Sequence, residues 1–129
     1  MKKYLLAMMA LVFSIGLVQA GPVDVKRAKL VGQQFAQATM QTKSADLELV
    51  YSPMLDRGTP AFFVFNIGQH GYVVVSGDDS YRPIIGFSRM DPFDPTNPEL
   101  AYYLRTIVAG RNATTACVTP EITAEWEMV

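Results

Sequence analysis

Two residue types that can form a nucleophile–base pair occur once each in the 129-residue sequence, as His70 and Cys117. A thiol and an imidazole that share a pocket are a common arrangement for covalent catalysis. His70, however, falls within the short segment Gly68-Gln69-His70-Gly71, and Cys117 falls in a stretch without regular patterning. Neither residue is surrounded by partners that would activate it. We therefore expect both to be unreactive, and the sequence predicts no enzyme.

Two adjacent carboxylates, Asp78 and Asp79, are the next candidates for chemistry. A cation site needs several more oxygen ligands at defined spacing, and the neighbouring sequence does not supply them. Ser, Gly and Asp are typical of turns, where their side chains bond the backbone, so we expect a structural role. Asn112-Ala113-Thr114 matches the N-glycosylation pattern, which is short and common by chance. The sequence predicts no metal site and no cofactor.

The segments that must position these residues are organised around positions 61 to 88. Ala61–Ile67 and Tyr72–Ser76 are rich in β-branched and aromatic residues and flank a turn with glycine at both ends, which predicts an antiparallel hairpin. Pro83–Ser88 follows a polar break and predicts a third strand, and the alternation of Leu47–Tyr51 predicts a fourth. The side chains expected on one buried face are Phe62, Val64, Tyr72, Val74, Ile84 and Phe87.

Helical spacing predicts two longer helices and one short one. The first runs from Asp24, as N-cap, to Thr39, and buries Ala28, Val31, Phe35 and Ala38. Within it, Gly32 permits close approach to a sheet. The second starts at Asn97-Pro98-Glu99 and runs to about Ala109, with Gly110 as C-cap. Thr119-Pro120-Glu121 starts the third, which would pack through Ile122 and Trp126.

These elements predict an α+β fold, in which an antiparallel sheet of about four strands packs against two or three helices. We expect the helices that begin at Asp24 and Pro98 to cover the same face of the sheet.

The first 20 residues have the pattern of a secretory signal peptide, with Lys2 and Lys3 before an apolar run and Val18-Gln19-Ala20 at the cleavage site. A membrane anchor is the alternative, but the apolar run is short for a span. Residues 21–129 would then form one exported domain, periplasmic or secreted. Loss of the two lysines leaves 9 of the 11 basic residues against 12 acidic ones, a net charge near −3. We expect no nucleic-acid partner and no membrane span after cleavage.

Three runs resemble a known family. They are Phe62-Phe63-Val64-Phe65-Asn66-Ile67, then Gly71-Tyr72-Val73-Val74-Val75-Ser76-Gly77-Asp78-Asp79, then Pro83-Ile84-Ile85-Gly86-Phe87-Ser88, followed by Phe93-Asp94. Their order and spacing resemble the propeptides of the streptopain family of bacterial cysteine peptidases. The resemblance covers most of residues 24–110. It departs at Arg89-Met90-Asp91-Pro92, where the family usually has a glycine before Phe-Asp.

The resemblance implies a function. Propeptides of this family cover the active-site cleft of the peptidase and hold it latent, and the catalytic part follows them. The chain ends at Val129 before such a part. The resemblance therefore implies a non-catalytic exported inhibitor that blocks the cleft of a streptopain-like cysteine peptidase. Two alternatives stay open, namely an N-terminal propeptide fragment of a longer precursor and a propeptide-like domain reused as a binding module.

We expect the proline-rich loop Asp91–Asn97 to form part of the surface that meets the peptidase. Its prolines reduce the entropy lost on binding, and Phe93 is an apolar anchor of the kind that dominates interfaces. Asp91, Asp94 and Asn97 could accept hydrogen bonds from the imidazolium or the backbone donors of a cysteine peptidase. The alternatives are that Phe93 folds back on the sheet and that Asn97 only caps its helix.

Overall fold

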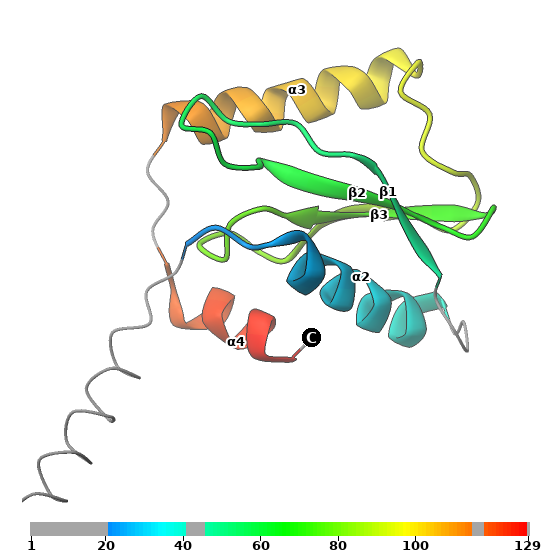
Figure 1. Ribbon diagram of the computed structural model, residues 1–129, viewed down its shortest axis with the longest axis horizontal. Helices are drawn as coiled ribbons and strands as arrows, with labels where there is room; N and C mark the ends of the chain where they lie inside the picture. The colour runs from blue at the N-terminus through cyan, green and yellow to red at the C-terminus, as the bar shows by residue number, and fades with distance from the viewer. Residues whose placement is uncertain (1–20, 41–45, 115–117, 129) are drawn as a thin grey trace, which may run out of the picture.

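The computed structural model describes residues 21–40, 46–114 and 118–128. The predicted signal peptide, residues 1–20, and Cys117 lie outside this part. Within these ranges seven elements follow one another, with the colours of Figure 1 running from blue to red. They are α2 (Val25–Met40), β1 (Leu47–Tyr51), β2 (Phe62–Ile67), β3 (Gly71–Ser76), β4 (Ile84–Ser88), α3 (Pro98–Ala113) and α4 (Pro120–Met128).

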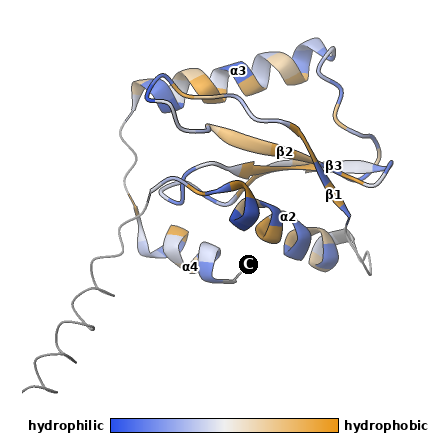
Figure 2. Cartoon of the chain, in the orientation of Figure 1, coloured by the Kyte–Doolittle hydropathy of each residue, from blue (hydrophilic) through white to orange (hydrophobic). Residues whose placement is uncertain are grey.

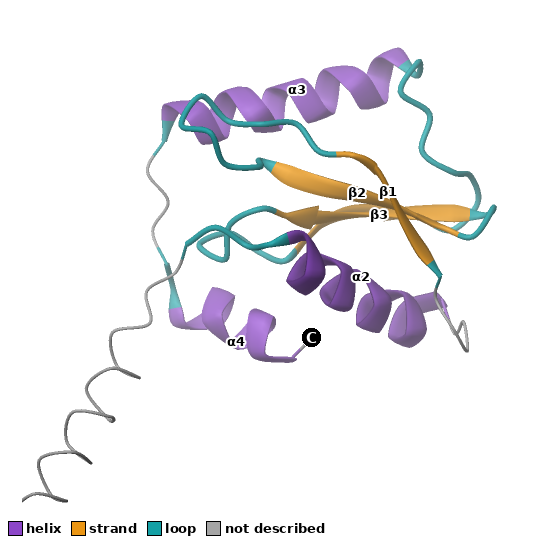
Figure 3. Ribbon diagram, viewed as in Figure 1, coloured by secondary structure: helices purple, strands orange, loops and turns teal. Residues whose placement is uncertain are grey.

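The four strands form one antiparallel sheet in the order β1-β2-β3-β4, so each strand pairs with its neighbour in sequence (Figure 3). The predicted hairpin is confirmed, with Phe62 opposite Ser76 and Ile67 opposite Gly71. The α+β class and the four strands are confirmed with it. No helix in the described ranges is both long enough and apolar enough to cross a bilayer.

The helices cover opposite faces of the sheet, with α3 on one face and α2 and α4 on the other (Figure 1). The prediction that both long helices share a face is therefore wrong. The reason lies in β2, where Phe63 and Phe65 pack toward α2 while Phe62 and Val64 pack toward α3. A strand apolar at successive positions is buried on both faces, and Figure 2 shows this continuous apolar colour in the centre of the sheet.

A register shift between Val74 and Val75 also changes which side chains of β4 face α3. Ile84 lies opposite Val75 and packs on the α2 side, and Ile85 packs on the α3 side. Phe87 is half exposed and sets its ring edge-on against Phe35 of α2. The predicted face is thus correct for the residues of β2 and β3 and wrong for Ile84 and Phe87, because these two lie opposite Val75 and Val73 of the α2-side cluster.

The helix starts agree with the sequence, and one helix end does not. Asp24 caps α2, since its Oδ1 accepts from the N–H of Arg27 at 2.8 Å. A Cβ at Gly32 would lie 2.8 Å from a methyl carbon of Leu47, so the predicted close approach to the sheet is confirmed. Ala36, not Ala38, completes the buried stripe. Helix α3 continues past Gly110 to Ala113, and its C-cap is Thr114, whose N–H and hydroxyl both donate to the Gly110 carbonyl.

Candidate functional site

The loop between β4 and α3 holds a half-buried aromatic ring in a defined position. The ring of Phe93 stacks on Tyr51 with centroids 5.7 Å apart and planes inclined by 13°. It also meets the ring of Tyr72 edge-on at 5.9 Å. The N–H of Phe93 donates to Oδ1 of Asn66 at 2.9 Å. Ring contacts with β1 and β3 and a hydrogen bond to a side chain of β2 therefore fix the loop on the α3 face of the sheet.

The polar residues of the loop stabilise turns and a helix start. Oδ1 of Asp94 accepts from the hydroxyl of Thr96 at 2.6 Å and from its N–H at 2.9 Å. These bonds, the hydroxyl bond first, lower the pKa of the Asp94 carboxyl, so this exposed side chain is negatively charged near neutral pH. Asn97 caps α3, with Oδ1 accepting from the backbone of Glu99 and Leu100.

The four residues expected at a peptidase contact line one hollow of about 520 Å³. Asp91 is exposed there and bonds the hydroxyl of Ser88 through its backbone N–H at 3.4 Å. The structure thus brings Asp91, Phe93, Asp94 and Asn97 together. It also gives Phe93 and Asn97 the packing and capping roles that were the alternatives.

The other sequence candidates have structural partners. Oδ1 of Asp78 accepts from the N–H of Ser80 at 2.8 Å, which closes a turn. Asp79 binds the N–H of Gly21 through Oδ1 and Arg27 through Oδ2 at 3.0 Å, and so ties the start of the described chain to the turn. His70 is exposed in the β2–β3 turn. In the described ranges, no group of three or more His, Cys, Asp or Glu residues could hold a metal ion.

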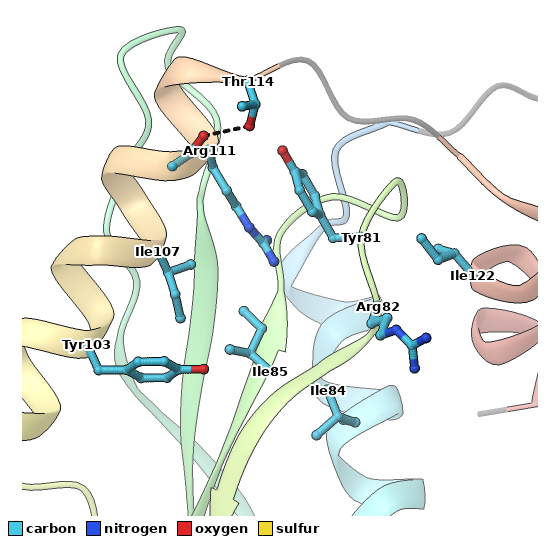
Figure 4. A pocket seen from close by; sticks show the side chains of 10 residues that line it. Tyr81, Arg82, Ile84, Ile85, Tyr103, Ile107, Arg111, Thr114 and Ile122 are labelled. Carbon is cyan, nitrogen blue, oxygen red and sulfur yellow. Dashed lines mark hydrogen bonds between the residues drawn. The ribbon is translucent and has the colours of Figure 1, made fainter.

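A second pocket of about 560 Å³ opens between α3, α4 and β4 (Figure 4). Its most notable residue is Arg111, whose guanidinium donates to the Ala61 carbonyl at 3.0 Å and to Oγ of Ser76 at 3.2 Å. The same group lies 3.9 Å from the centre of the Tyr81 ring. Burial lowers the pKa of Arg111, although a guanidinium stays charged in proteins.

Arg111 therefore joins the last turn of α3 to the ends of two strands and to the Tyr81 ring. Helix α4 is joined to Tyr81 and to the neighbouring Arg82 from the opposite face of the sheet. There Nε1 of Trp126 donates to the Tyr81 carbonyl at 2.7 Å, and Arg82 pairs with Glu125 at 2.9 Å. The Tyr81 hydroxyl is buried and has no hydrogen-bond partner among the described residues. These polar groups hold the domain together, so we assign the pocket to the fold and not to a partner.

The role of Arg111 was missed from the sequence, because a basic residue in the last turn of a helix usually complements the helix dipole in solvent. The sequence nevertheless contains a pattern that indicates the burial of Arg111. Leu104, Val108 and Arg111 follow one another at spacings of four and three residues, which places the arginine on the apolar stripe of the helix.

Comparison with known protein families shows which family the chain matches. A model of the family described as Spi protease inhibitor matches residues 20–109. The matched range contains α2, the whole sheet and the loop that carries Phe93, but neither Arg111 nor α4.

Among curated proteins, the chain is 31% identical over 100 residues to "Thiol protease/hemagglutinin PrtT" of Porphyromonas gingivalis. The alignment covers 73% of this chain and 11% of that protein, so the chain corresponds to about a tenth of that relative's length. No solved structure matches the chain.

Proposed function

Because the chain belongs to the Spi protease inhibitor family, we propose that it is a non-catalytic, exported inhibitor that blocks the active-site cleft of a streptopain-like cysteine peptidase. The observation that carries this proposal is the family match over residues 20–109, which contains every strand and the loop with the expected contact residues. The similarity to a thiol protease favours a cysteine peptidase as the target class.

The geometry of the loop supports a role in binding. Phe93 is already held between Tyr51 and Tyr72, so little side-chain entropy is lost when the remaining exposed part of the ring meets a partner. The Asp94 carboxylate is exposed and charged. It can accept a charge-assisted hydrogen bond from a catalytic imidazolium or from backbone N–H groups at the rim of a cleft.

Inhibition kinetics test the proposal. The purified protein is titrated against a streptopain-like peptidase whose active sites have been counted, and against a papain-like peptidase as a control for the fold of the target. We expect stoichiometric, substrate-competitive inhibition of the first enzyme only. Binding should persist when the catalytic cysteine of the target is changed to alanine, because no covalent step is proposed. A folded protein that inhibits no streptopain-like peptidase at micromolar concentration would refute the proposal.

A second candidate function is that of a propeptide within a longer precursor. The observation that favours it is that the aligned stretch of the thiol protease relative is a small part of a much longer protein. The reading frame after Val129 decides between the two. A continuous frame into a catalytic domain supports the propeptide, and a stop codon with a peptidase gene beside it supports the separate inhibitor. If both are absent, the third possibility, reuse as a binding module, gains support.

A further inference from the structure

The first strand of the sheet has one unpaired edge. β1 is the terminal strand in the order β1-β2-β3-β4, and no described strand pairs with its outer side. Figure 1 shows β1 in front of the other strands, with α3 above it and α2 below it. The backbone N–H and C=O groups on such an edge form a template for another extended segment.

The side chains on this edge are unusually apolar for an exposed strand. Leu49, Val50 and Tyr51 are consecutive and are 43%, 38% and 42% exposed, and Met54 shortly after them is 55% exposed. Of the features that protect a sheet edge from pairing, β1 lacks lysine and proline and has only the charged Glu48 and a register shift between Leu49 and Tyr51. Leu49 lies opposite Phe65 of the α2-side cluster and Tyr51 opposite Val64 of the α3-side cluster, so exposed apolar side chains border the edge on both faces of the sheet.

The same edge is continuous with the loop of the proposed contact. Tyr51 of β1 stacks on Phe93 of the loop. Glu48 of β1 lies opposite Asn66, and the side chain of Asn66 holds the Phe93 backbone. The edge and the loop therefore form one surface, which a single partner can cover.

Charge indicates the chemistry of that partner. Exposed carboxylates flank the apolar positions, with Asp46 and Glu48 at the start of the edge and Asp91 and Asp94 on the loop. A segment with apolar side chains and basic flanks complements such a surface.

We propose that the outer edge of β1 is where the inhibitor pairs, strand to strand, with an extended segment of the target peptidase that carries apolar side chains and basic flanks. This inference rests on the proposed inhibitory function and adds the place and the mode of contact. In strand addition, main-chain hydrogen bonds supply affinity and side-chain contacts supply specificity. Leu49, Val50 and Tyr51 give the apolar contacts, and the prepositioned Phe93 extends them.

The opposite edge of the sheet is a poorer candidate. The exposed aromatic of β4, Phe87, is already in contact with Phe35 on one side and with the guanidinium of Arg89 at 5.7 Å. Ile84 and Ile85 of the same strand are half buried beside α3 and α4.

Lysine substitutions on the edge test the proposal through the inhibition constant. We expect Leu49→Lys and Val50→Lys each to raise it at least about tenfold, because a cation would face apolar and basic groups of the partner. Tyr102→Lys is the matched control, since Tyr102 is 69% exposed on α3, and its inhibition constant should stay within about twofold. Melting temperatures verify that the variants are folded.

Hydrogen exchange of the unsubstituted protein tests the same point without a variant. Amides of residues 48–51 that exchange rapidly in the free inhibitor should become protected in the complex. If the protein inhibits while these amides keep their exchange rates, or while both edge variants keep full potency, strand pairing is refuted and the inhibitory function stands. If the unsubstituted protein inhibits no peptidase, both proposals fail. If the free protein forms a dimer that protects the same amides, the edge belongs to a second copy, and the assignment to the peptidase is overturned.

Discussion

Helix α4 lies outside the range that the family shares, yet the structure makes it part of the core. Trp126 is 5% exposed and packs with the α2-side cluster, and its indole N–H donates to the Tyr81 carbonyl. We predict that Trp126→Ala strongly destabilises the whole domain and does not merely release a terminal helix.

The magnitude follows from the contacts. Truncation of a buried Trp or Phe to Ala typically costs about 3–5 kcal/mol. The lost indole hydrogen bond adds about 1 kcal/mol, and the cation–π contact with Arg27, at 4.9 Å, adds about 0.5 kcal/mol because Arg27 is exposed. Partial collapse of a short terminal helix onto the gap offsets some of this loss. We therefore expect the free energy of unfolding to fall by about 4 kcal/mol, a large part of the roughly 5–15 kcal/mol available to a domain.

Urea denaturation followed by far-ultraviolet circular dichroism measures this change, since the substitution removes the only tryptophan and with it the fluorescence signal. Trp126→Phe keeps most of the apolar contact and loses the hydrogen bond, so it should cost about 1–2 kcal/mol. Glu127→Ala alters an exposed neighbour in the same helix and should stay within about 0.5 kcal/mol. If Trp126→Ala costs less than about 1 kcal/mol, α4 is dispensable and the reasoning is refuted.

Four further predictions follow from other features. Phe93→Ala should raise the inhibition constant at least about tenfold with only a modest fall in melting temperature; equal potency, or general unfolding, would remove the loop from the contact. Gly32→Val should destabilise the domain by about 2 kcal/mol or more, because even a Cβ there would meet a side chain of β1 at 2.8 Å; an unchanged melting temperature would show that the layers can separate freely. The stabilisation that Asp94 gains from its lowered pKa is present above the usual value of 3.8 and is lost as pH falls through the native value. The melting temperatures of the parent and of Asp94→Asn should therefore converge in acid, and a difference that does not change with pH would contradict this. His70→Ala should leave inhibition within about threefold, as expected for an exposed turn residue, and a loss of inhibition without unfolding would mean that the histidine takes part.

Much of the fold could be predicted because its signals are local. The glycines around the β2–β3 turn, Asp24 and Asn97 as helix caps, and the alternation of β1 each act over a few residues. The assignment of helices to faces could not be predicted in the same way. The continuous apolar run of β2 indicates burial on both sides, but only the assembled layers show which helix covers which side.

The local structure of the β4–α3 loop could be predicted from the sequence, its tertiary contacts could not, and its role as a peptidase contact stays a prediction. The prolines of the loop predicted irregular structure correctly, and the Asn-Pro-Glu pattern predicted the start of α3. The stacking of Phe93 on Tyr51 joins residues 42 positions apart, and no local pattern encodes such a contact. Arg111 illustrates the same limit, because its partners Ala61 and Ser76 lie 50 and 35 positions away.

The three-layer construction has a consequence for how such a domain can change its target during evolution. Both broad faces of the sheet are occupied by the domain's own helices, so in the proposed mode of inhibition the target is recognised by the rim of the sheet, where the β1 edge and the β4–α3 loop meet. Substitutions on a rim alter few interior contacts and cost little stability. The interior residues can therefore stay constant while the rim residues are substituted, and one scaffold could inhibit peptidases with differently shaped clefts. Exchange of the rim residues between two such domains should transfer target preference and leave the melting temperature of each scaffold nearly unchanged.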